Sequence, residues 1–364
     1  MAKEINCRNV HEAFALGMDA FRWDTCVEEQ DSRAGKTLEF TTPVITTYQK
    51  PCERVLFWKP RDANPFFHFM EGLWMLQGRE DVDYLVRYNK GMSAFSDNGA
   101  TLNGAYGYRW RNFYGQDQLT VIVNRLKEKP DDRRCVVAMW DCDNDLDRNT
   151  LDTPCNTQIY FKIRNNKLNM TVCCRSNDMI WGAYGANAVH FSMLQEYMAG
   201  RIGVEVGVYN QISDSFHVYV SLYKQMDEAM PDQDYYSLKY PMISNPYEKH
   251  VKPYPMVSEP EYFDEDLEKF FQYCYNNTED YVYSNQFFTD VAIPMERAWQ
   301  LHREDGQTQA AINLLDVLCK AEDWKIACID WLQRRLENKE EVKDTEAVIG
   351  DEEEKDIGPC HNGK

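Results

Sequence analysis

The sequence predicts an α+β fold in which a mixed β-sheet is packed by helices. Segments rich in β-branched residues at 41–48, 157–163 and 168–174 are typical of strands, whereas apolar residues recur at helical spacing in 10–22 and 188–199. The middle of the chain therefore mixes sheet and helix. With 364 residues, of which 43% are hydrophobic and 13% aromatic, the chain can bury one large core or two modest ones.

The first predicted helix, 10–22, leads into a polar turn at 31–37 and then into the strand 41–48. A second helix is expected at 66–77, where the sequence is apolar enough for burial. Glu71 lies within it. A lone buried carboxylate is costly, so its position favours a functional role.

The middle region contains a hairpin signal, because the polar turn 164–167 separates two segments typical of strands. Arg133 and Arg134 stand at the start of a further strand, which ends in Trp140. In chain order, the expected elements are a helix at 118–127, a strand at 134–140, the hairpin strands 157–163 and 168–174, a helix at 188–199, and a strand at 204–212 that ends at 213–219.

The C-terminal part begins with an irregular connection, 231–260, which is rich in Pro, Tyr and polar residues. Two helical patterns follow, at 307–320 and 324–335. Residues after Leu336 are dominated by Glu, Asp and Lys, and they have too few large apolar groups to offset the entropy of ordering. We therefore expect 337–364 to be an acidic, disordered tail.

Composition excludes several classes of protein. A net charge of −19 argues against long nucleic-acid tracks, which need clustered Lys and Arg. The sequence has neither a run of eighteen apolar residues nor the pattern of a signal peptide, so we expect a soluble, cytoplasmic protein that binds no membrane. The twelve Cys include no Cys-x-x-Cys pair, and the acidic run 141–147 lacks the Gly and Glu of a calcium loop. No metal site is expected.

Cys155, in Asp152-Thr153-Pro154-Cys155-Asn156-Thr157, is the candidate nucleophile. Antiparallel pairing of the two hairpin strands would bring Arg175 back beside it. A guanidinium next to a thiol stabilises the thiolate, and it can also hold a phosphate by paired hydrogen bonds. An ordinary surface Arg near a buried Cys is the alternative interpretation of this pair.

Further motifs follow in a fixed order. They are Pro154-Cys155, Arg175-Ser176-x-Asp178, Gly182 followed by Asn187, and His217-Val218-Tyr219, preceded by Arg33, Glu71 in Glu-x-Leu-Trp, Gly104-x-Tyr106-Gly107-x-x-Trp110-Arg111 and Asp132-Arg133-Arg134. In this order and near these spacings, the chain resembles the thymidylate synthase family, which includes the pyrimidine nucleotide hydroxymethylases. The resemblance runs from about residue 10 to about residue 225.

The resemblance implies a role for each matching residue. Cys155 would add to C6 of a pyrimidine nucleoside monophosphate, so that C5 attacks the methylene of 5,10-methylenetetrahydrofolate, with Tyr106 near the sulfur and Glu71 moving protons and organising water at the folate. Asn187 would bind the base edge and Asp178 the pterin. The 5′-phosphate would be held by Arg33, Arg175 and Ser176, and by Arg133 and Arg134 from the other subunit of a homodimer; His217 and Tyr219 would bind the sugar.

The resemblance also implies an organisation for the chain. A thymidylate synthase-like catalytic core, 1–225, would form a homodimer through its sheet. A helical extension, 226–336, would pack on this core, and the acidic tail would follow. The same residues have structural alternatives: His217 and Tyr219 could be satisfied core polar groups, and Tyr106 could serve packing alone.

Departures from the synthase pattern bear on the product. The segment 90–97 contains no Trp to pack against folate, and the C-terminus differs from the apolar synthase tail that excludes water. Asn156 stands where synthases commonly have His, and Cys174 where they have Gln. These features favour water as the last nucleophile, which gives a hydroxymethyl group.

The choice of base stays open. An Asn amide can pair with either uracil or cytosine, and Asn187 falls one residue later after Gly182 than in synthases. The context of Cys155 and Arg175 favours dCMP slightly over dUMP. A thymidylate synthase and a nucleotide-binding relative without catalysis are the competing hypotheses.

Overall fold

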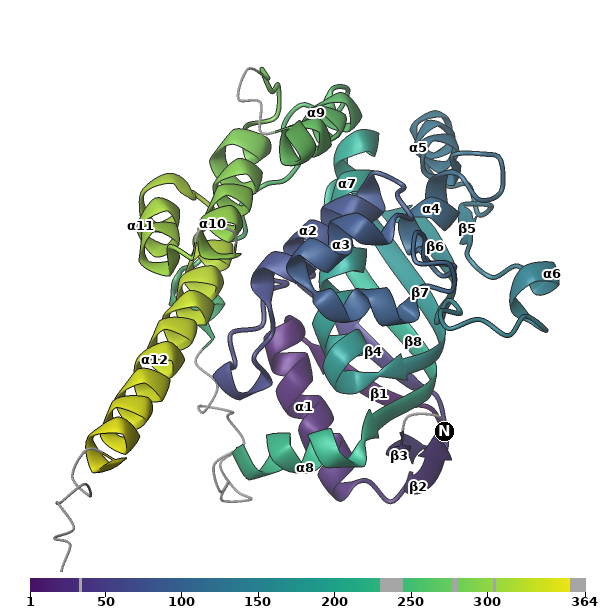
Figure 1. The fold of residues 1–364 in the computed structure, drawn as a ribbon. Coiled ribbons are helices and arrows are strands. Elements are labelled where there is room, and N and C mark those ends of the chain that lie inside the picture. The colour runs from purple at the N-terminus through teal and green to yellow at the C-terminus, as the bar shows by residue number, and fades with distance from the viewer. Residues whose placement is uncertain (33–34, 230–244, 277–280, 304–305, 354–364) are drawn as a thin grey trace, which may run out of the picture.

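The structure is a computed structural model that describes residues 1–32, 35–229, 245–276, 281–303 and 306–353, without the side chains of 338–353. An eight-stranded mixed sheet forms its centre, in the order β1-β4-β8-β7-β6-β5, with the β2–β3 hairpin joined to β8 through β3 (Figure 1). The strands are β1 (Lys3–Cys7), β2 (Val27–Ser32), β3 (Gly35–Phe40), β4 (Val44–Tyr48), β5 (Val136–Ala138), β6 (Asn156–Arg164), β7 (Lys167–Asp178) and β8 (Glu205–Tyr219).

β8 organises the sheet because it pairs with three other strands. It runs parallel to β7 and antiparallel to β4 and β3. Parallel and antiparallel pairs therefore coexist, and the predicted α+β fold with a mixed sheet is confirmed. These pairings also explain why the strand predicted at 204–212 continues to Tyr219.

Helices pack on one face of the sheet, and others extend beyond it (Figure 1). On β7 the residues at 168, 170, 172 and 174 are buried beneath them, whereas those at 169, 171 and 173 are only half-buried on the other face. The α-helices are α1 (Val10–Trp23), α2 (Pro65–Leu76), α3 (Val82–Tyr88), α4 (Tyr106–Arg111), α5 (Gln118–Glu128), α6 (Cys142–Asp145), α7 (Asn187–Ile202), α8 (Val220–Ala229), α9 (Phe263–Asn276), α10 (Ile293–Arg303), α11 (Thr308–Leu318) and α12 (Glu322–Glu353).

The C-terminal helices reach the rest of the molecule through aromatic contacts. Phe66 of α2 lies 5.4 Å from Trp299 of α10 and 5.9 Å from Trp331 of α12, measured between ring centroids. Phe69, one turn further along α2, meets Trp324 of α12 at 5.1 Å. Because α2 also carries Glu71, these contacts tie the extension directly to the helix that holds a candidate site residue.

Several predicted elements differ in extent from those observed. The polar turn predicted at 31–37 consists instead of the facing ends of β2 and β3, with residues 33–34 outside the described chain. The strand predicted at 134–140 narrows to β5 because only its centre pairs with β6. Of the irregular connection 231–260, residues 231–244 lie outside the described chain, and the rest contains the short 3-10 turn Pro246–Lys249. The backbone of α12 continues into the segment 337–364, for which disorder stays a prediction.

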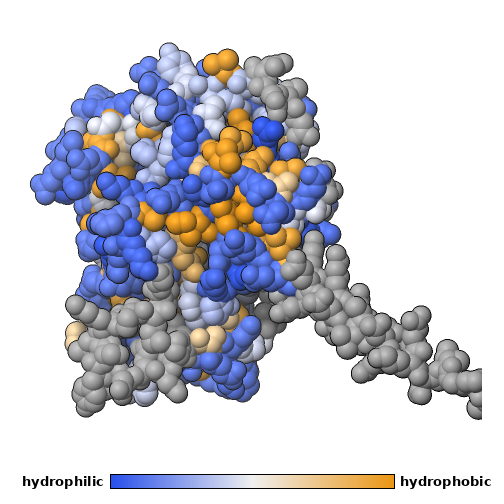
Figure 2. Space-filling model, turned by 90° about the vertical axis from the view of Figure 1, so that its left-hand side faces the viewer, coloured by the Kyte–Doolittle hydropathy of each residue, from blue (hydrophilic) through white to orange (hydrophobic). Residues whose placement is uncertain are grey.

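The surface over the extension is not uniformly polar. Figure 2 looks at the left-hand side of Figure 1, where α11 and α12 lie, and hydrophobic residues gather there between hydrophilic ones. α11 ends in Val317 and Leu318, two apolar side chains that are largely exposed. Among the described helices, none is both long enough and apolar enough to cross a membrane.

Candidate functional site

The β6–β7 hairpin places Cys155 and Arg175 side by side. Its two-residue turn is formed by Asn165 and Asn166, whose φ angles of 52° and 57° lie in the left-handed region that Asn tolerates. The register then pairs Asn156 with Cys174, and the Arg175 backbone N–H donates to the Cys155 carbonyl at 2.9 Å. The predicted proximity is confirmed.

The Arg175 side chain donates hydrogen bonds to backbone carbonyls of the segment that carries Cys155. Its Nε donates to the Pro154 carbonyl at 3.0 Å and its Nη2 to the Thr153 carbonyl at 3.1 Å. These bonds leave further N–H groups of this exposed guanidinium for a ligand. That Arg175 lowers the pKa of the Cys155 thiol stays a prediction.

Two adjoining cavities meet at Cys155. The strand cavity, of about 510 Å³, is lined mainly by residues of β3, β7, β8 and the segment 151–155. The helix cavity, of about 730 Å³, is lined mainly by residues of α2, α12 and the segment 176–187. Phe95, Ser176, Asp178 and Tyr219 also line both cavities. A ligand that spans the two would therefore pass the Cys155 sulfur.

The strand cavity is lined by four of the residues predicted to bind a nucleotide: Arg175, Ser176, His217 and Tyr219. The parallel register of β7 and β8 sets Ser176 opposite Ser215 and Asp178 opposite His217. His217 and Tyr219 form an edge-to-face ring pair at 6.0 Å, and both line the cavity. Arg33 lies outside the described residues, so its role at the phosphate stays a prediction.

In the helix cavity, Glu71 has a histidine partner. His190 of α7 places its Nε2 at 3.0 Å from the Glu71 Oε2, but the two groups are not aligned for a hydrogen bond. Gly72 allows the two helices to approach, because a Cβ there would collide with the Met193 sulfur. The Glu71 carboxylate is therefore buried, as expected, and the His190 ring lies beside it.

His68 lines the helix cavity. Burial, followed by the nearby charges of Arg61 and His190, holds the pKa of His68 well below its ordinary value. His68 is therefore neutral near pH 7 and can act as a hydrogen-bond donor or acceptor without adding charge to the cavity.

Tyr106 of α4 lies near the nucleophile. Burial, and then the neighbouring Cys155, raise the pKa of its phenol well above the ordinary value, so the hydroxyl stays protonated. Asp152 ties this region to the nucleophile segment, since its Oδ2 accepts the Gly104 backbone N–H at 2.7 Å. The position of Tyr106 beside Cys155 agrees with the role that the resemblance implies.

Asn187 begins α7 and faces the helix cavity. Its Nδ2 donates to Asn177 Oδ1 at 3.0 Å, and Asn177 in turn donates to Ser213 at 2.9 Å, which fixes the orientation of the Asn187 amide. The preceding segment, Met179–Ala186, forms a π-helix with a non-helical Gly185. A π-turn accommodates one additional residue, which accounts for the later position of Asn187.

Asp178 presents an unused oxygen to the cavities. Its Oδ1 accepts the Trp181 N–H at 2.5 Å, whereas its buried Oδ2 has no hydrogen-bond partner among the described residues. Burial raises the pKa of this carboxyl above its ordinary value. An orphaned acceptor of this kind suits an N–H group of a bound heterocycle.

Arg133 and Arg134 do not reach either cavity of their own chain. Both are exposed before β5, and the Arg134 Nη2 lies 2.8 Å from an Asp132 oxygen. Their assignment to the site of a second subunit stays a prediction.

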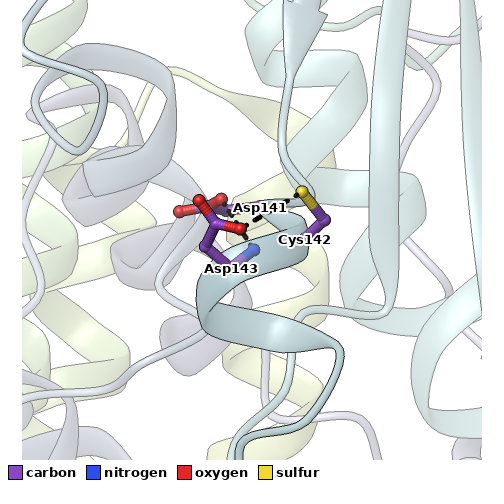
Figure 3. Close-up of side chains that lie close together, drawn as sticks. All are labelled: Asp141, Cys142 and Asp143. Atoms are coloured by element: carbon purple, nitrogen blue, oxygen red, sulfur yellow. Dashed lines mark hydrogen bonds between the residues drawn. The ribbon is translucent and has the colours of Figure 1, made fainter.

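The acidic run 141–147 contains a close group of side chains on α6. Figure 3 shows the side chains of Asp141, Cys142 and Asp143 close together. One carboxylate oxygen of each Asp and the Cys142 sulfur lie within 4.8 Å of one another. Asp145 serves the fold, because it forms a buried ion pair with Arg109 at 2.6 Å. The absence of a metal stays a prediction.

Sequence reasoning missed several residues that line the helix cavity, and it missed His190, which contacts Glu71 of that lining. His190 follows Asn187 by three residues and thus shares its helix face, a spacing that could have indicated it. Trp331 and Arg335 share a face of α12 in the same way. Trp181 had no such signal, because its exposure depends on the π-helix.

Comparison with known proteins agrees with this geometry. A profile described as thymidylate synthase matches residues 60–255. The chain belongs to the thymidylate synthase family. Members of this family are one-carbon transferases that use methylenetetrahydrofolate, and the chain is such an enzyme.

Two phage proteins named deoxyuridylate hydroxymethyltransferase are among its relatives. The protein from Pseudomonas phage M6 is 43% identical over 92% of this chain and 94% of its own length. That from Bacillus phage SP01 is also 43% identical, over 55% of each chain. A putative thymidylate synthase from Methanosarcina acetivorans is 30% identical over 59% of this chain and 88% of its own length.

Proposed function

We propose that this enzyme hydroxymethylates C5 of deoxyuridylate, with methylenetetrahydrofolate as the one-carbon donor. The observation that carries the proposal is the position of Cys155, which lines both the strand cavity and the helix cavity. A nucleotide in the first cavity and a folate in the second would meet at its sulfur. The phage relative that spans most of the chain supports the hydroxymethyl product by its name.

The reaction starts when the Cys155 thiolate bonds to C6 of the pyrimidine, which makes C5 nucleophilic. C5 then bonds to the methylene carbon that the folate supplies. C5 loses its proton to a base and the bond from the methylene to the folate nitrogen breaks, so that tetrahydrofolate leaves. Water then adds to the exocyclic methylene on C5, and the Cys155 bond to C6 breaks. One water is consumed, and the nucleotide and folate are neither oxidised nor reduced overall.

The strand cavity would hold the phosphate and sugar. Arg175 and Ser176, together with Arg33, supply donors for the phosphate, and His217 and Tyr219 face the same cavity for the sugar hydroxyl. Arg133 and Arg134 are assigned to the phosphate in the site of a second copy, which accounts for their distance from their own cavities.

The helix cavity would hold the base and the folate. With one Nδ2 proton engaged by Asn177, the Asn187 amide keeps one donor and one acceptor for a base edge. We infer that the substrate is deoxyuridylate because both phage relatives are named deoxyuridylate hydroxymethyltransferase. The comparisons lend no support to the slight preference for dCMP. Asp178 Oδ2 suits a pterin N–H, and Glu71 with His190 can activate the water that adds last.

One assay tests the proposal. The enzyme is incubated with methylenetetrahydrofolate and either dUMP, dCMP or CMP, and the mass of each product is read. A hydroxymethyl product from dUMP supports the proposal. A hydroxymethyl product from dCMP alone corrects the base, and a methyl product from dUMP identifies a thymidylate synthase instead.

A second measurement separates catalysis from binding alone. A 5-fluoro analogue of the reactive nucleotide cannot lose its C5 substituent, so with folate present an active Cys155 should hold a covalent ternary adduct. Intact protein mass detects it. Nucleotide binding without an adduct would identify a non-catalytic relative, and Cys155→Ser provides the negative control.

A further inference from the structure

Helix α12 supplies part of the wall of the helix cavity. Trp331 and Arg335, one turn apart, line it together with Arg61, Asp62 and Trp181. The family profile ends at residue 255, so α12 lies outside the matched region. The wall of the helix cavity thus combines residues from the region that the family profile matches with residues of the C-terminal extension.

Two guanidinium groups lie over indole rings at this end of the cavity. The Arg335 guanidinium carbon lies 3.6 Å from the centroid of Trp331, and that of Arg61 lies 4.2 Å from the centroid of Trp181. A cation over an indole face is a favourable arrangement that also holds both planar groups in place. An indole ring and a positive charge therefore occur together twice, once within α12 and once where Arg61 meets Trp181 of the segment 179–186.

Asp62 pairs with the arginines of α12 at this end of the cavity. Asp62 accepts two hydrogen bonds from Arg335, each of 2.7 Å, and it is also bonded by Arg334. Burial acts to raise the pKa of the Asp62 carboxyl, but the Arg335 and Arg334 bonds outweigh it and hold the pKa below the ordinary value. Arg335 and Arg334 thus share Asp62, and Arg334 also pairs with Asp330 at 3.1 Å.

Arg61 adds a further cation. Its side chain is buried, and its Nε donates to the Ile180 carbonyl at 3.0 Å. The carboxylates of Asp178 and Asp62 are the nearby opposite charges. Burial lowers the pKa of Arg61 to about 10, so it remains charged near neutral pH. In a chain of net charge −19, Arg61 and Arg335 thus place two cations in the wall of the helix cavity.

An unused donor lies at the same place. The Trp331 Nε1–H is buried and has no hydrogen-bond partner among the described residues. A buried donor without a partner costs free energy, which an acceptor on a bound ligand would recover.

We propose that Trp331 and Arg335 of α12, with Arg61, form a subsite for an aromatic ring joined to carboxylates, the aryl-glutamate end of the folate cosubstrate. The inference rests on the proposed function for the identity of the ligand. The half-exposed indole of Trp181, which lines the same wall, accepts the ring, and the two arginines retain donors for the carboxylates. The extension therefore takes part in cosubstrate binding.

Arg335→Ala and Arg334→Ala form a matched pair for the test. Both remove a bond to Asp62, but only Arg335 lines the helix cavity, while Arg334 lines a separate hollow between α12 and residues 56–63. The dissociation constant of tetrahydrofolate is measured by calorimetry in the presence of the reactive nucleotide, and it is compared with that of tetrahydropteroate, which lacks the glutamate.

Arg335→Ala is expected to weaken tetrahydrofolate binding by about three- to ten-fold, as the loss of one partly exposed charged contact implies, and to leave tetrahydropteroate binding unchanged. Arg334→Ala should change neither by more than about two-fold. Equal weakening of both ligands by Arg335→Ala, or equal effects of the two variants, would overturn the subsite. Nucleotide affinity and thermal unfolding confirm that each variant is folded.

These measurements do not depend on the product. If the wild-type enzyme yields a methyl product, the proposed function fails while the binding comparison still decides the subsite. If wild-type protein binds both folates equally well, the subsite fails whatever the product is.

Discussion

At the scale of single residues, Glu71 and His190 are the groups best placed to move a proton. Both are buried, and their facing atoms lie 3.0 Å apart without an aligned hydrogen bond. Glu71 also lines the cavity that Cys155 enters. A carboxylate held in this way can take a proton from water and pass it on with little rearrangement.

Glu71→Gln is expected to lower kcat by about 10²- to 10⁴-fold, the usual contribution of a general acid or base. The amide keeps the size and one acceptor of the carboxylate but cannot exchange a proton. KM for the nucleotide should change little, because Glu71 is not among the residues proposed to bind the phosphate, the sugar or the base edge. Steady-state rates read by product mass test this.

Glu80→Gln is the matched control, since this half-buried carboxylate follows α2 and lines neither cavity. It should retain wild-type kcat. A Glu71→Gln enzyme with normal kcat would exclude Glu71 as the proton-transfer group, and a rise in nucleotide KM without a fall in kcat would assign it to binding.

Individual residues differ in how far the sequence could predict their place. Cys155 and Arg175 meet across a hairpin whose turn is visible in the sequence, so local pairing alone brings them together. Glu71 and His190 meet only because α2 packs on α7, a contact between distant segments. Trp331 and Arg335 reach the helix cavity only because the whole C-terminal extension packs against the core. Local periodicity does not determine such contacts.

At the scale of elements, α12 is held by a buried carboxyl in its first turn. Asp323 accepts the Tyr247 hydroxyl at 3.0 Å and lies near Arg54. Burial raises its pKa from 3.8 to about 6, against the lowering effects of the Trp324 N–H, Tyr247 and Arg54. The anchor of the cavity wall is therefore sensitive to pH.

Asp323→Asn should flatten part of the pH dependence of stability. A carboxyl whose pKa is raised on folding stabilises the folded state below its ordinary pKa, and this contribution is lost as the pH rises through about 6. Wild type should therefore lose about 3 kcal/mol of unfolding free energy between pH 4 and 7 that the variant does not lose. This figure corresponds to a pKa shift of about two units. Urea unfolding at several pH values measures the difference.

Asp316→Asn on α11 removes an exposed carboxylate and is the control for charge alone. Its difference from wild type should stay nearly constant over the same range. A constant difference for Asp323→Asn as well would contradict the assignment of this titration to Asp323.

At the scale of the whole molecule, one face of the sheet and two arginines remain without a role inside a single chain. Alternate residues of β7 on that face, at 169, 171 and 173, are only half-buried. Arg133 and Arg134 are exposed and lie outside both cavities. A symmetric dimer through the sheet would cover this face, and it would bring Arg133 and Arg134 to the phosphate site of the other subunit.

Subunit complementation tests shared sites directly. Cys155→Ser removes the nucleophile, and the double variant Arg133→Ala with Arg134→Ala removes the donated arginines, so each should be inactive or weak alone. Unfolded together in equal amounts and refolded, they should recover about one quarter of wild-type activity, because half of the random dimers are mixed and each mixed dimer has one complete site. Activity of the mixture decides between shared and separate sites.

The complementation also distinguishes the source of any recovered activity. The control is a triple variant that carries Cys155→Ser together with Arg133→Ala and Arg134→Ala. A mixture of this variant with Cys155→Ser contains no intact nucleophile, so it must stay inactive. If the arginines served their own chain, the mixed dimer would contain no complete site and activity would not exceed the sum of the parts. Sedimentation of wild type as a monomer would rule out the dimer and, with it, any role of Arg133 and Arg134 at the phosphate, because neither reaches the cavities of its own chain.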